Sequence, residues 1–229
     1  MASIPVNNLS EGNPSVLATR YGAYVLPDGY LINFDVYQGK SPNANSAYEH
    51  HFGKCAAPLL TLIDEFPNEK KRMPYHCFFD NLFTSLNLLN YFRQQGYGAT
   101  GTVRENRLQK CKKLTSNKIM KKKQSGYHEY AISKEDRVIV AKWMDNSIVS
   151  IASNNLDVQP LSMVKRYSQK DKATTQVPRP FLLGEYNKYM VVTGWTKINM
   201  YRIHIRGKKW YWSLITWMLD TCTQCLATT

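Results

Sequence analysis

The sequence predicts an α/β fold, and three observations support this. Runs rich in aromatic and β-branched residues flank a Pro-Asp-Gly turn at 27–29, which is typical of a β-hairpin. An apolar run at 75–79, a helix pattern that begins at Thr84 or Ser85, and a second strand-like run at 97–103 follow in that order. Strand, helix and strand over this length suggest a parallel βαβ unit. Further strand-like runs, separated by turn residues, come later in the chain.

The expected elements are placed by their periodicity and by turn residues. The hairpin strands are expected at 21–26 and 30–37, and a helix at 47–66 that Pro58 kinks or splits. The helix after residue 84 should end at Gln95, before Gly96. The late strands are expected at 128–133, 137–143 and 148–153, and the late helices at 185–190 and 210–226.

The domain organisation follows from the regions that lack such patterns. Residues 1–20 are polar and weakly patterned, so we expect a disordered lead-in. One domain should then span 21–229. Residues 155–180 are polar and contain three prolines, and together with the basic stretch and the late strands they are expected to form an insertion at about 104–180.

Composition and charge narrow the classes of protein. Hydrophobic residues make up 43% and aromatic residues 12%, which is a globular rather than a disordered composition. No apolar run approaches the ~20 residues that span a bilayer, and the first ten residues lack a secretory signal. We therefore expect a soluble protein, nuclear or cytoplasmic and not secreted, with no membrane partner. Lys and Arg number 30 against 17 Asp and Glu, a formal charge of +13, which favours nucleic acid as the partner over a basic surface that serves only solubility.

The most basic stretch, Arg104–Lys123, holds nine Lys or Arg and one acid, Glu105. It has few core residues, so we expect a loop or an exposed arm. Clustered cations bind DNA phosphates with release of counterions, and we favour phosphate contact over a loop that is merely solvated. The candidate DNA-binding residues of this stretch are Arg104, Arg107, Lys110, Lys112, Lys113, Lys121, Lys122 and Lys123.

A second group of cations, Arg206, Lys208 and Lys209, stands beside the aromatic run at 210–212. These cations are further DNA-binding candidates. Aromatic rings in such a setting stack on unpaired bases in some DNA-handling proteins. Core residues that open an amphipathic helix are the more common case, and we prefer that interpretation of the rings.

Metal and hydrolase sites of other kinds have little support. Cys222 and Cys225 have C-x-x-C spacing, but a zinc site needs a second pair of ligands, so two thiols on the last helix are preferred. Adjacent helical residues do not face each other, so His50 and His51 are interpreted as helix surface. No nucleotide-triphosphatase, serine-hydrolase or zincin motif occurs.

Several segments, in their order and spacing, resemble the piggyBac transposase family. They are GYLINFDVYQGK at 29–40, FDNLFTS at 79–85, GTVRENR at 101–107, WMDN at 143–146 with SN at 153–154, YNKYM at 186–190, and YR at 201–202 with RGKKWYW at 206–212. The resemblance runs from about Tyr21 to the end of the chain, and it is nearest to the domesticated, transposon-derived members found in animal genomes. It implies an RNase H-like mixed sheet with flanking helices and three essential aspartates.

In active members of that family the aspartates hold Mg²⁺. Two such ions, roughly 3.5–4 Å apart, activate the attacking oxygen and stabilise the leaving one, and hard divalent ions prefer carboxylate ligands. The family's second aspartate lies in a D-N-x-F-T-S motif, which Asp80 to Ser85 match here. Without the motif, Asp80 would be an ordinary strand-end or helix-cap residue. With it, Asp80 is the expected remnant catalytic residue and metal ligand, at a position we expect to be unoccupied.

The other two aspartates of the family are not matched. The third ends a Y-N-x-x-M-G-G-x-D pattern, whose last position here is Gly194, and the acid that usually follows three residues later is Lys197. The first belongs to a D-E motif on a strand before the hairpin, and residues 1–20 hold a single acid, Glu11, in an unrelated setting. We therefore expect the first catalytic strand to be missing, along with the family's N-terminal region and its cysteine-rich zinc domain.

Three functions remain open. The first is a degenerate, transposon-derived protein that binds DNA without cleaving or joining it and that uses no cofactor. The second is an active transposase or nuclease with three aspartates, which the missing carboxylates oppose. The third is a non-functional translated relic or a truncated gene model, which the surviving basic clusters and the coherent pattern of core residues oppose. A homo-oligomer is compatible with the sequence.

Overall fold

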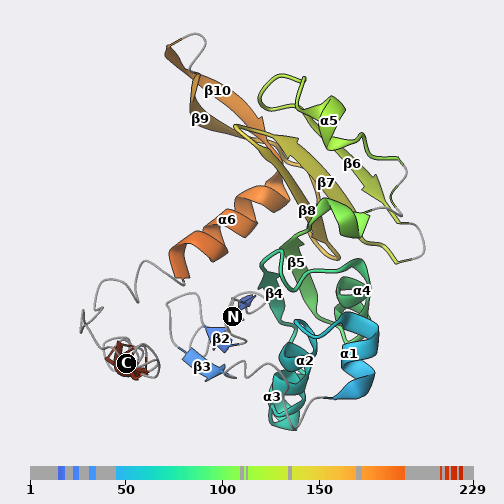
Figure 1. Ribbon diagram of the computed structural model, residues 1–229, viewed down its shortest axis with the longest axis vertical. Coiled ribbons are helices and arrows are strands. Elements are labelled where there is room, and N and C mark those ends of the chain that lie inside the picture. Colours follow the sequence, from blue (N-terminus) through green and yellow to red (C-terminus); the bar gives the residue numbers. More distant parts are fainter. Residues whose placement is uncertain are drawn as a thin grey trace. The chain divides into compact units, whose positions relative to one another are not determined.

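The computed structural model describes residues 45–108, 111, 113–133, 136–168 and 172–193, three short strands nearer the N-terminus, and the helical residues 212, 215–216, 218–220 and 222–223. The chain divides into two compact units, whose elements are labelled in Figure 1. Unit 1 comprises Met1–Phe78 and Asn187–Thr229, and unit 2 comprises Phe79–Tyr186. The boundaries of the predicted domain and of its insertion stay predictions.

Unit 1 contains the predicted hairpin. β2 (Ala23–Val25) pairs antiparallel with β3 (Leu31–Phe34), with Ala23 opposite Phe34. β1 (Ser15–Ala18) pairs antiparallel with β2, and the strand order in this unit is β3-β2-β1-β4. The prediction of a disordered lead-in over 1–20 is therefore wrong for 15–18, where four residues are too few to give a periodic signal. A strand does precede the hairpin, and its four residues include no acid.

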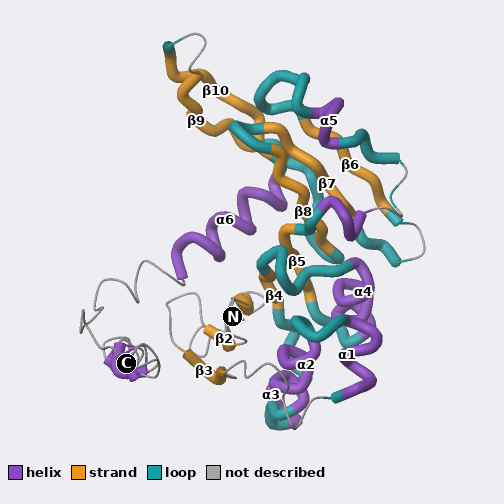
Figure 2. The backbone as a smooth tube through the Cα atoms, in the orientation of Figure 1, coloured by secondary structure: helices purple, strands orange, loops and turns teal. Residues whose placement is uncertain are grey.

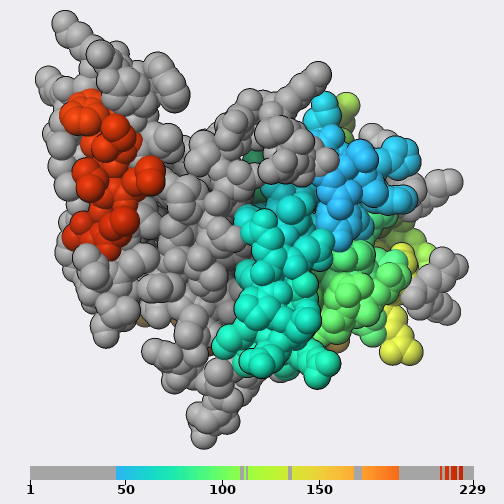
Figure 3. All heavy atoms as spheres, turned by 90° about the horizontal axis from the view of Figure 1, so that it is seen from below, coloured from blue at the N-terminus to red at the C-terminus, as the bar shows by residue number. Residues whose placement is uncertain are grey.

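The predicted helix at 47–66 is split into two. α1 (Ser46–Phe52) begins after Asn45, whose side chain accepts from the amides of the first turn, and it ends at Gly53, where φ is 85°. α2 (Ala57–Asp64) follows, with Pro58 in its first turn, where a proline is tolerated because it has no N–H to satisfy. The break thus lies before Pro58. α1 and α2 contact each other, and Figure 3 shows α1 in blue beside the turquoise residues that follow it. A short helix, α3 (Asn68–Lys71), completes this part.

β4 (His76–Phe79) is buried along its whole length and is the apolar strand predicted at 75–79. Inside unit 1 the ring of His76 stacks on Phe78, with 4.3 Å between centroids, and Phe78 stacks on Tyr189 at 4.8 Å. His76 is 8% exposed, and burial lowers the pKa of its imidazole from 6.5 to about 4. The stack therefore holds a neutral histidine at physiological pH.

Unit 2 is built on antiparallel strands in the order β5-β8-β7-β6. They are β5 (Gly98–Thr102), β6 (His128–Ile132), β7 (Ile139–Met144) and β8 (Ile148–Ser153). β7 and β8 pair from Ile139 opposite Ser153 to Met144 opposite Ile148, so the predicted turn at 145–146 joins them. β7 is buried on both faces, which explains why all its residues except Lys142 are apolar.

α4 (Leu86–Gln94) lies against β5 and β8 and buries Leu88, Leu89 and Phe92. Its N-cap is Ser85, whose hydroxyl accepts from the Leu88 amide at 3.2 Å. Both the cap and the inward face agree with the helix predicted at this place.

Asn154, directly after β8, joins α4 and β5 to the sheet. It is 4% exposed. Its amide nitrogen donates to the carbonyls of Leu89 at 2.9 Å and Tyr97 at 3.0 Å, and its side-chain oxygen accepts from the Ala99 amide at 2.7 Å. One buried side chain therefore makes three hydrogen bonds to backbone groups of α4, the residue before β5 and β5 itself.

The polar stretch at 155–180 contains a second, two-stranded sheet that the sequence did not predict. β9 (Ser162–Ser168) and β10 (Ala173–Arg179) pair antiparallel along their whole length, and α6 (Phe181–Thr193) follows. The indole of Trp143 in β7 donates to the carbonyl of Pro178 in β10 at 2.8 Å. The described residues of β9 alternate between half-buried and exposed, but the sequence of the ribbon shows no alternation of apolar and polar residues that could have indicated strands.

The basic stretch was expected to be a loop or an exposed arm, and its described residues combine two short helical turns with irregular segments. It contains a 3-10 turn, η1 (Glu105–Leu108), and a short helix, α5 (Asn117–Met120), which is labelled in Figure 2. Leu108 is 5% exposed and Met120 is 0% exposed, so the stretch has its own contacts with the core of unit 2. None of the described helices combines the length and the apolar composition that crossing a bilayer requires.

The buried histidine predicts a pH dependence of stability. The unfolded chain takes up a proton on His76 near pH 6.5, and the folded chain does so only near pH 4, because burial opposes the charge. The free energy of unfolding should therefore fall by about 3 kcal/mol in total as the pH drops from 6.5 to 4. We expect His76→Gln to flatten urea-unfolding stability over this window, whereas His50→Gln, on the exposed side of α1, should leave the slope unchanged.

Asn154 predicts a large local cost of truncation. Asn154→Ala should lower the free energy of unfolding by about 3 kcal/mol, because it removes three hydrogen bonds from a buried side chain to the backbone. The same substitution at Asn146, in the exposed turn between β7 and β8, is the matched control and should cost less than about 0.5 kcal/mol. Equal urea midpoints for the two variants would contradict the role assigned to Asn154.

Candidate functional site

The site starts where β4 ends, at Asp80, which is half-buried. The backbone carbonyl of Asp80 accepts from the amides of Phe83 at 3.1 Å and Thr84 at 3.2 Å, and from the Thr84 hydroxyl at 2.9 Å. The Asp80 carboxylate accepts from the Asn81 amide at 2.6 Å. The residues of the D-N-x-F-T-S motif thus fold a tight turn that fixes the position of Asp80 by local hydrogen bonds.

Arg107 holds this turn from the outside. Its guanidinium donates to the carbonyls of Thr84 at 2.6 Å, Leu82 at 3.0 Å and Asn81 at 3.2 Å. Arg104 donates to the side-chain oxygen of Asn81 at 3.1 Å. Both arginines were predicted as phosphate contacts, and in the structure their donors also serve the turn that carries Asp80. The acceptors are backbone carbonyls, which sequence motifs do not reveal.

Gly101, the first residue of the G-T-V-R-E-N-R motif, lies directly beneath the turn. A Cβ at this position would lie 2.2 Å from the Thr84 hydroxyl and 2.8 Å from the carbonyl of Phe79. Only glycine allows β5 to approach the turn this closely. The two motifs, separated in sequence, therefore form one packed structure in unit 2.

Tyr186 of α6 lies near Asp80 and the end of β5. Its hydroxyl lies 3.2 Å from that of Thr102 at the end of β5. Burial raises the pKa of Tyr186 to about 12; the hydrogen bond with Thr102 opposes this rise, and the negative charge of Asp80 adds to it. The tyrosine is therefore a neutral hydrogen-bonding group near the carboxylate, a role that the Y-N-x-x-M motif alone did not indicate.

The described residues around Asp80 do not fit a two-metal centre. Within the described part of the chain, no three side chains of His, Cys, Asp or Glu come together as a metal site would require. Gly194, which the sequence resemblance matches to the family's third aspartate, and Lys197 lie outside the described residues. Asp80 is thus the one carboxylate of the predicted set that the structure places, and we derive no metal-dependent step from it.

Five exposed lysines, which we call the basic surface, gather on and around α5. They are Lys113, Lys118, Lys121, Lys122 and Lys123. The ammonium of Lys123 lies over the ring of Tyr127, 5.2 Å from its centroid. The remaining DNA-binding candidates, Lys110, Lys112, Arg206, Lys208 and Lys209, lie outside the described residues.

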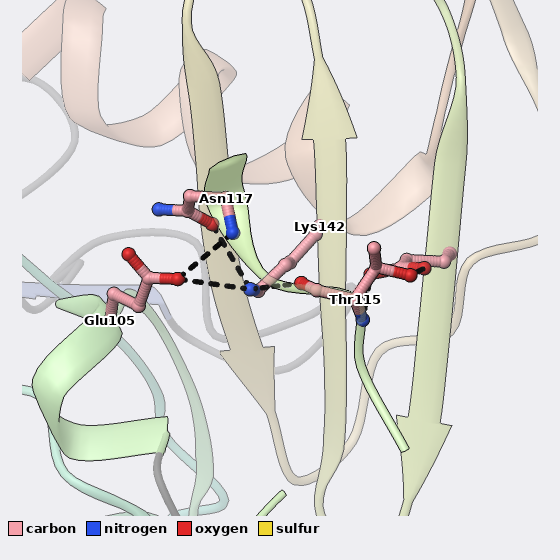
Figure 4. Close-up of polar contacts among 5 residues, drawn as sticks. Glu105, Thr115, Asn117 and Lys142 are labelled. Atoms are coloured by element: carbon pink, nitrogen blue, oxygen red, sulfur yellow. Dashed lines mark hydrogen bonds and ion pairs between the residues drawn. The ribbon is translucent and has the colours of Figure 1, made fainter. Parts of the chain in front are cut away.

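A network of polar side chains lies under the basic surface, and Figure 4 shows it in close-up. The ammonium of Lys142, on β7, donates to the carbonyl of Thr115 at 2.8 Å and to the side-chain oxygen of Asn117 at 3.0 Å, and lies 3.8 Å from Glu105. Glu105 in turn accepts from the Asn117 amide at 3.0 Å. The carboxylate of Glu129, on β6, accepts from the amide and the hydroxyl of Thr115 at 2.7 and 2.6 Å.

The other candidate ligands stay apart. His50 and His51 lie on α1 with their rings edge to face, 5.3 Å between centroids, and both are exposed. Cys222 is exposed and has a free thiol, and Cys225 lies outside the described residues. Cys77 is fully buried in β4, and burial raises the pKa of its thiol, so it is an unreactive core residue.

The comparisons with known proteins agree with this picture. The model of the transposase IS4 family matches residues 11–224. PiggyBac transposable element-derived protein 3 of Homo sapiens is 38% identical over 198 residues, which cover 86% of this chain and 32% of that protein. PiggyBac transposable element-derived protein 2 of Homo sapiens is 33% identical over 214 residues, which cover 93% of this chain and 35% of that protein. The chain thus spans about a third of the length of these curated relatives.

A solved structure shows the same fold. A piggyBac transposase synaptic complex with hairpin DNA, determined by cryo-electron microscopy, matches with a TM-score of 0.54 and 15% identity over 88% of this chain and 38% of that chain. The likeness agrees with the α/β, RNase H-like sheet with flanking helices expected from the sequence. Because the family model matches nearly the whole length of this chain, the chain belongs to the transposase IS4 family, among the piggyBac-type proteins.

Proposed function

We propose that this chain binds duplex DNA through the basic surface and that it neither cleaves nor joins DNA strands. The observation that carries the proposal is the basic surface itself, in which the exposed lysines stand close together on a backbone with buried anchors. Closely spaced cations bind the phosphate backbone with little regard for sequence. The solved relative whose fold matches is described in complex with hairpin DNA, which supports DNA as the partner.

The second half of the proposal rests on the carboxylates. Asp80 keeps the turn that its motif encodes, but the resemblance places Gly194 and Lys197 where the family has acids. A lysine near a divalent-ion position opposes binding of the ion by charge repulsion. The strand before the hairpin, β1, has the sequence Ser-Val-Leu-Ala. A DNA-binding role without catalysis would be exercised in the nucleus, which we propose as the location.

We predict no DNA cleavage. Incubation of the protein with piggyBac-type transposon-end duplexes in Mg²⁺ or Mn²⁺ should leave the strands intact on a denaturing gel. Gly194→Asp alone should restore nothing, since the first of the three carboxylates would still be missing. Nicking by the parent that disappears in Asp80→Ala, in preparations cleared of contaminating nuclease, would falsify this half of the proposal.

We predict that the lysines after α5 contribute phosphate contacts. Each contact adds ~0.9 to the slope of log affinity against log salt, so replacing Lys121, Lys122 and Lys123 with alanine should lower that slope by up to about 2.7 and weaken binding similarly on every duplex. Fluorescence anisotropy titrations of random and transposon-end duplexes at several salt concentrations measure both quantities.

The matched control removes three consecutive cations elsewhere. Lys70, Lys71 and Arg72, at and after α3 in unit 1, are replaced with alanine, so both variants lose the same formal charge. This control should bind like the parent. If the two triple variants lose equal affinity, binding reflects net charge alone, and the DNA surface has been assigned wrongly.

A further inference from the structure

We propose that Lys142 is a positioning residue for DNA binding: it does not touch the DNA, and it holds the basic surface in a single conformation. The inference rests on the proposed function and deepens it. The lysines of the basic surface are exposed, whereas Lys142 is buried, and the inference depends on this difference.

Lys142 cannot serve as a phosphate contact in this structure. It is 3% exposed and lies in β7, between β6 and β8. A buried ammonium is costly unless its protons find acceptors. All its described acceptors, the Thr115 carbonyl, the Asn117 side chain and Glu105, come from the basic stretch rather than from the sheet. The lysine therefore needs the basic stretch to be folded against β7.

The same contacts fix the backbone that carries the exposed lysines. Asn117 is the first residue of α5, and the Lys121 amide donates to its carbonyl at 3.0 Å. The Lys122 amide donates to the carbonyl of Ile119 at 3.1 Å, and the Lys123 amide donates to the carbonyl of Met120 at 3.0 Å. Because α5 is only one turn long, it would not persist in water without such tertiary anchors. The position of the three lysines thus depends on how firmly Asn117 is held.

The carboxylates near the basic surface are also used to hold it. Glu105 accepts from the Asn117 amide, and both oxygens of Glu129 accept from Thr115. Three charged side chains from η1, β6 and β7 therefore grip the backbone at 115–117 from different sides. The acids that would otherwise repel phosphate are engaged in hydrogen bonds to the backbone, while the lysines of the basic surface remain exposed.

An ordered surface binds more tightly than a disordered one with the same charges. The apparent dissociation constant equals the intrinsic one divided by the fraction of molecules in the binding-competent form. If removal of the Lys142 ammonium leaves the stretch ordered in a tenth of the molecules, affinity falls about tenfold. The number of phosphates contacted in the complex stays the same, so the salt slope does not change.

The test is Lys142→Met in the full chain, which keeps the length of the side chain and removes its charge. Hydrogen exchange read by mass spectrometry should show lost protection of the amides at 117–123 and retained protection in β7 and β8. Binding to a random duplex should weaken about tenfold at every salt concentration, with a salt slope within ~0.5 of the parent. The Lys121, Lys122 and Lys123 triple alanine variant, measured alongside, should instead lower the slope.

Two outcomes would overturn the inference. In one, Lys142→Met keeps the protection of 117–123 and binds like the parent, so the lysine is not needed for order. In the other, protection is unchanged and the slope falls by ~0.9, so Lys142 contacts a phosphate itself. If the triple alanine variant also binds like the parent, the proposed DNA surface fails as well, and the two failures are told apart by that variant.

A second variant decides the case in which Lys142→Met does not fold. Thr115→Val is neutral in charge, leaves Lys142 in place and removes the 2.6 Å bond from the Thr115 hydroxyl to Glu129. It should bind DNA about threefold more weakly with an unchanged slope and partial loss of protection at 117–123. Parent-like binding despite that loss of protection would show that order in the basic stretch does not matter for DNA affinity.

Discussion

Buried polar side chains on the central strands of unit 2 are the constraint on which this structure depends. Asn154 and Lys142 follow or lie within apolar strands, and burial obliges them to find partners. Their partners include backbone groups of other segments: α4 and the start of β5 for Asn154, and the basic stretch for Lys142. An apolar side chain at either place would pack, but it would leave those segments without an anchor.

The turn that carries Asp80 follows the same logic. Gly101 admits the turn against β5, and Arg107 satisfies three of its carbonyls. None of these contacts involves a metal ion or a second carboxylate. The geometry of the turn therefore depends on residues other than the two further carboxylates that the family resemblance implies. A similar fold at this turn is therefore no evidence for catalytic activity.

The parts of the fold that were predicted have a local signal in the sequence. The hairpin, the helix that starts at Ser85 and the turn between β7 and β8 each depend on residues that are neighbours in the chain. The parts that were missed depend on distant ones. The sequence of the β9–β10 ribbon lacks an alternation of apolar and polar residues. The basic stretch was expected to be a loop or an exposed arm because its anchors, Glu129 and Lys142, lie on other strands, distant in the sequence. Arg107 was predicted to contact phosphate, because a sequence does not reveal which backbone carbonyls a side chain will bind.

A count of charges cannot distinguish the roles that the cations of this chain play. Lys142 offsets buried acceptors, Arg107 braces a turn, and the lysines after α5 remain exposed to solvent. Of these three, only the exposed lysines attract a polyanion with their full charge. The charges of Lys142 and Arg107 are partly balanced by the groups that they bind. The formal charge of +13 favours the proposed class of partner, whereas burial and hydrogen bonding decide which of the described cations can contact it. Under the proposal made above, Lys142 holds the exposed lysines of the basic surface in place, and this role does not require the catalytic carboxylates.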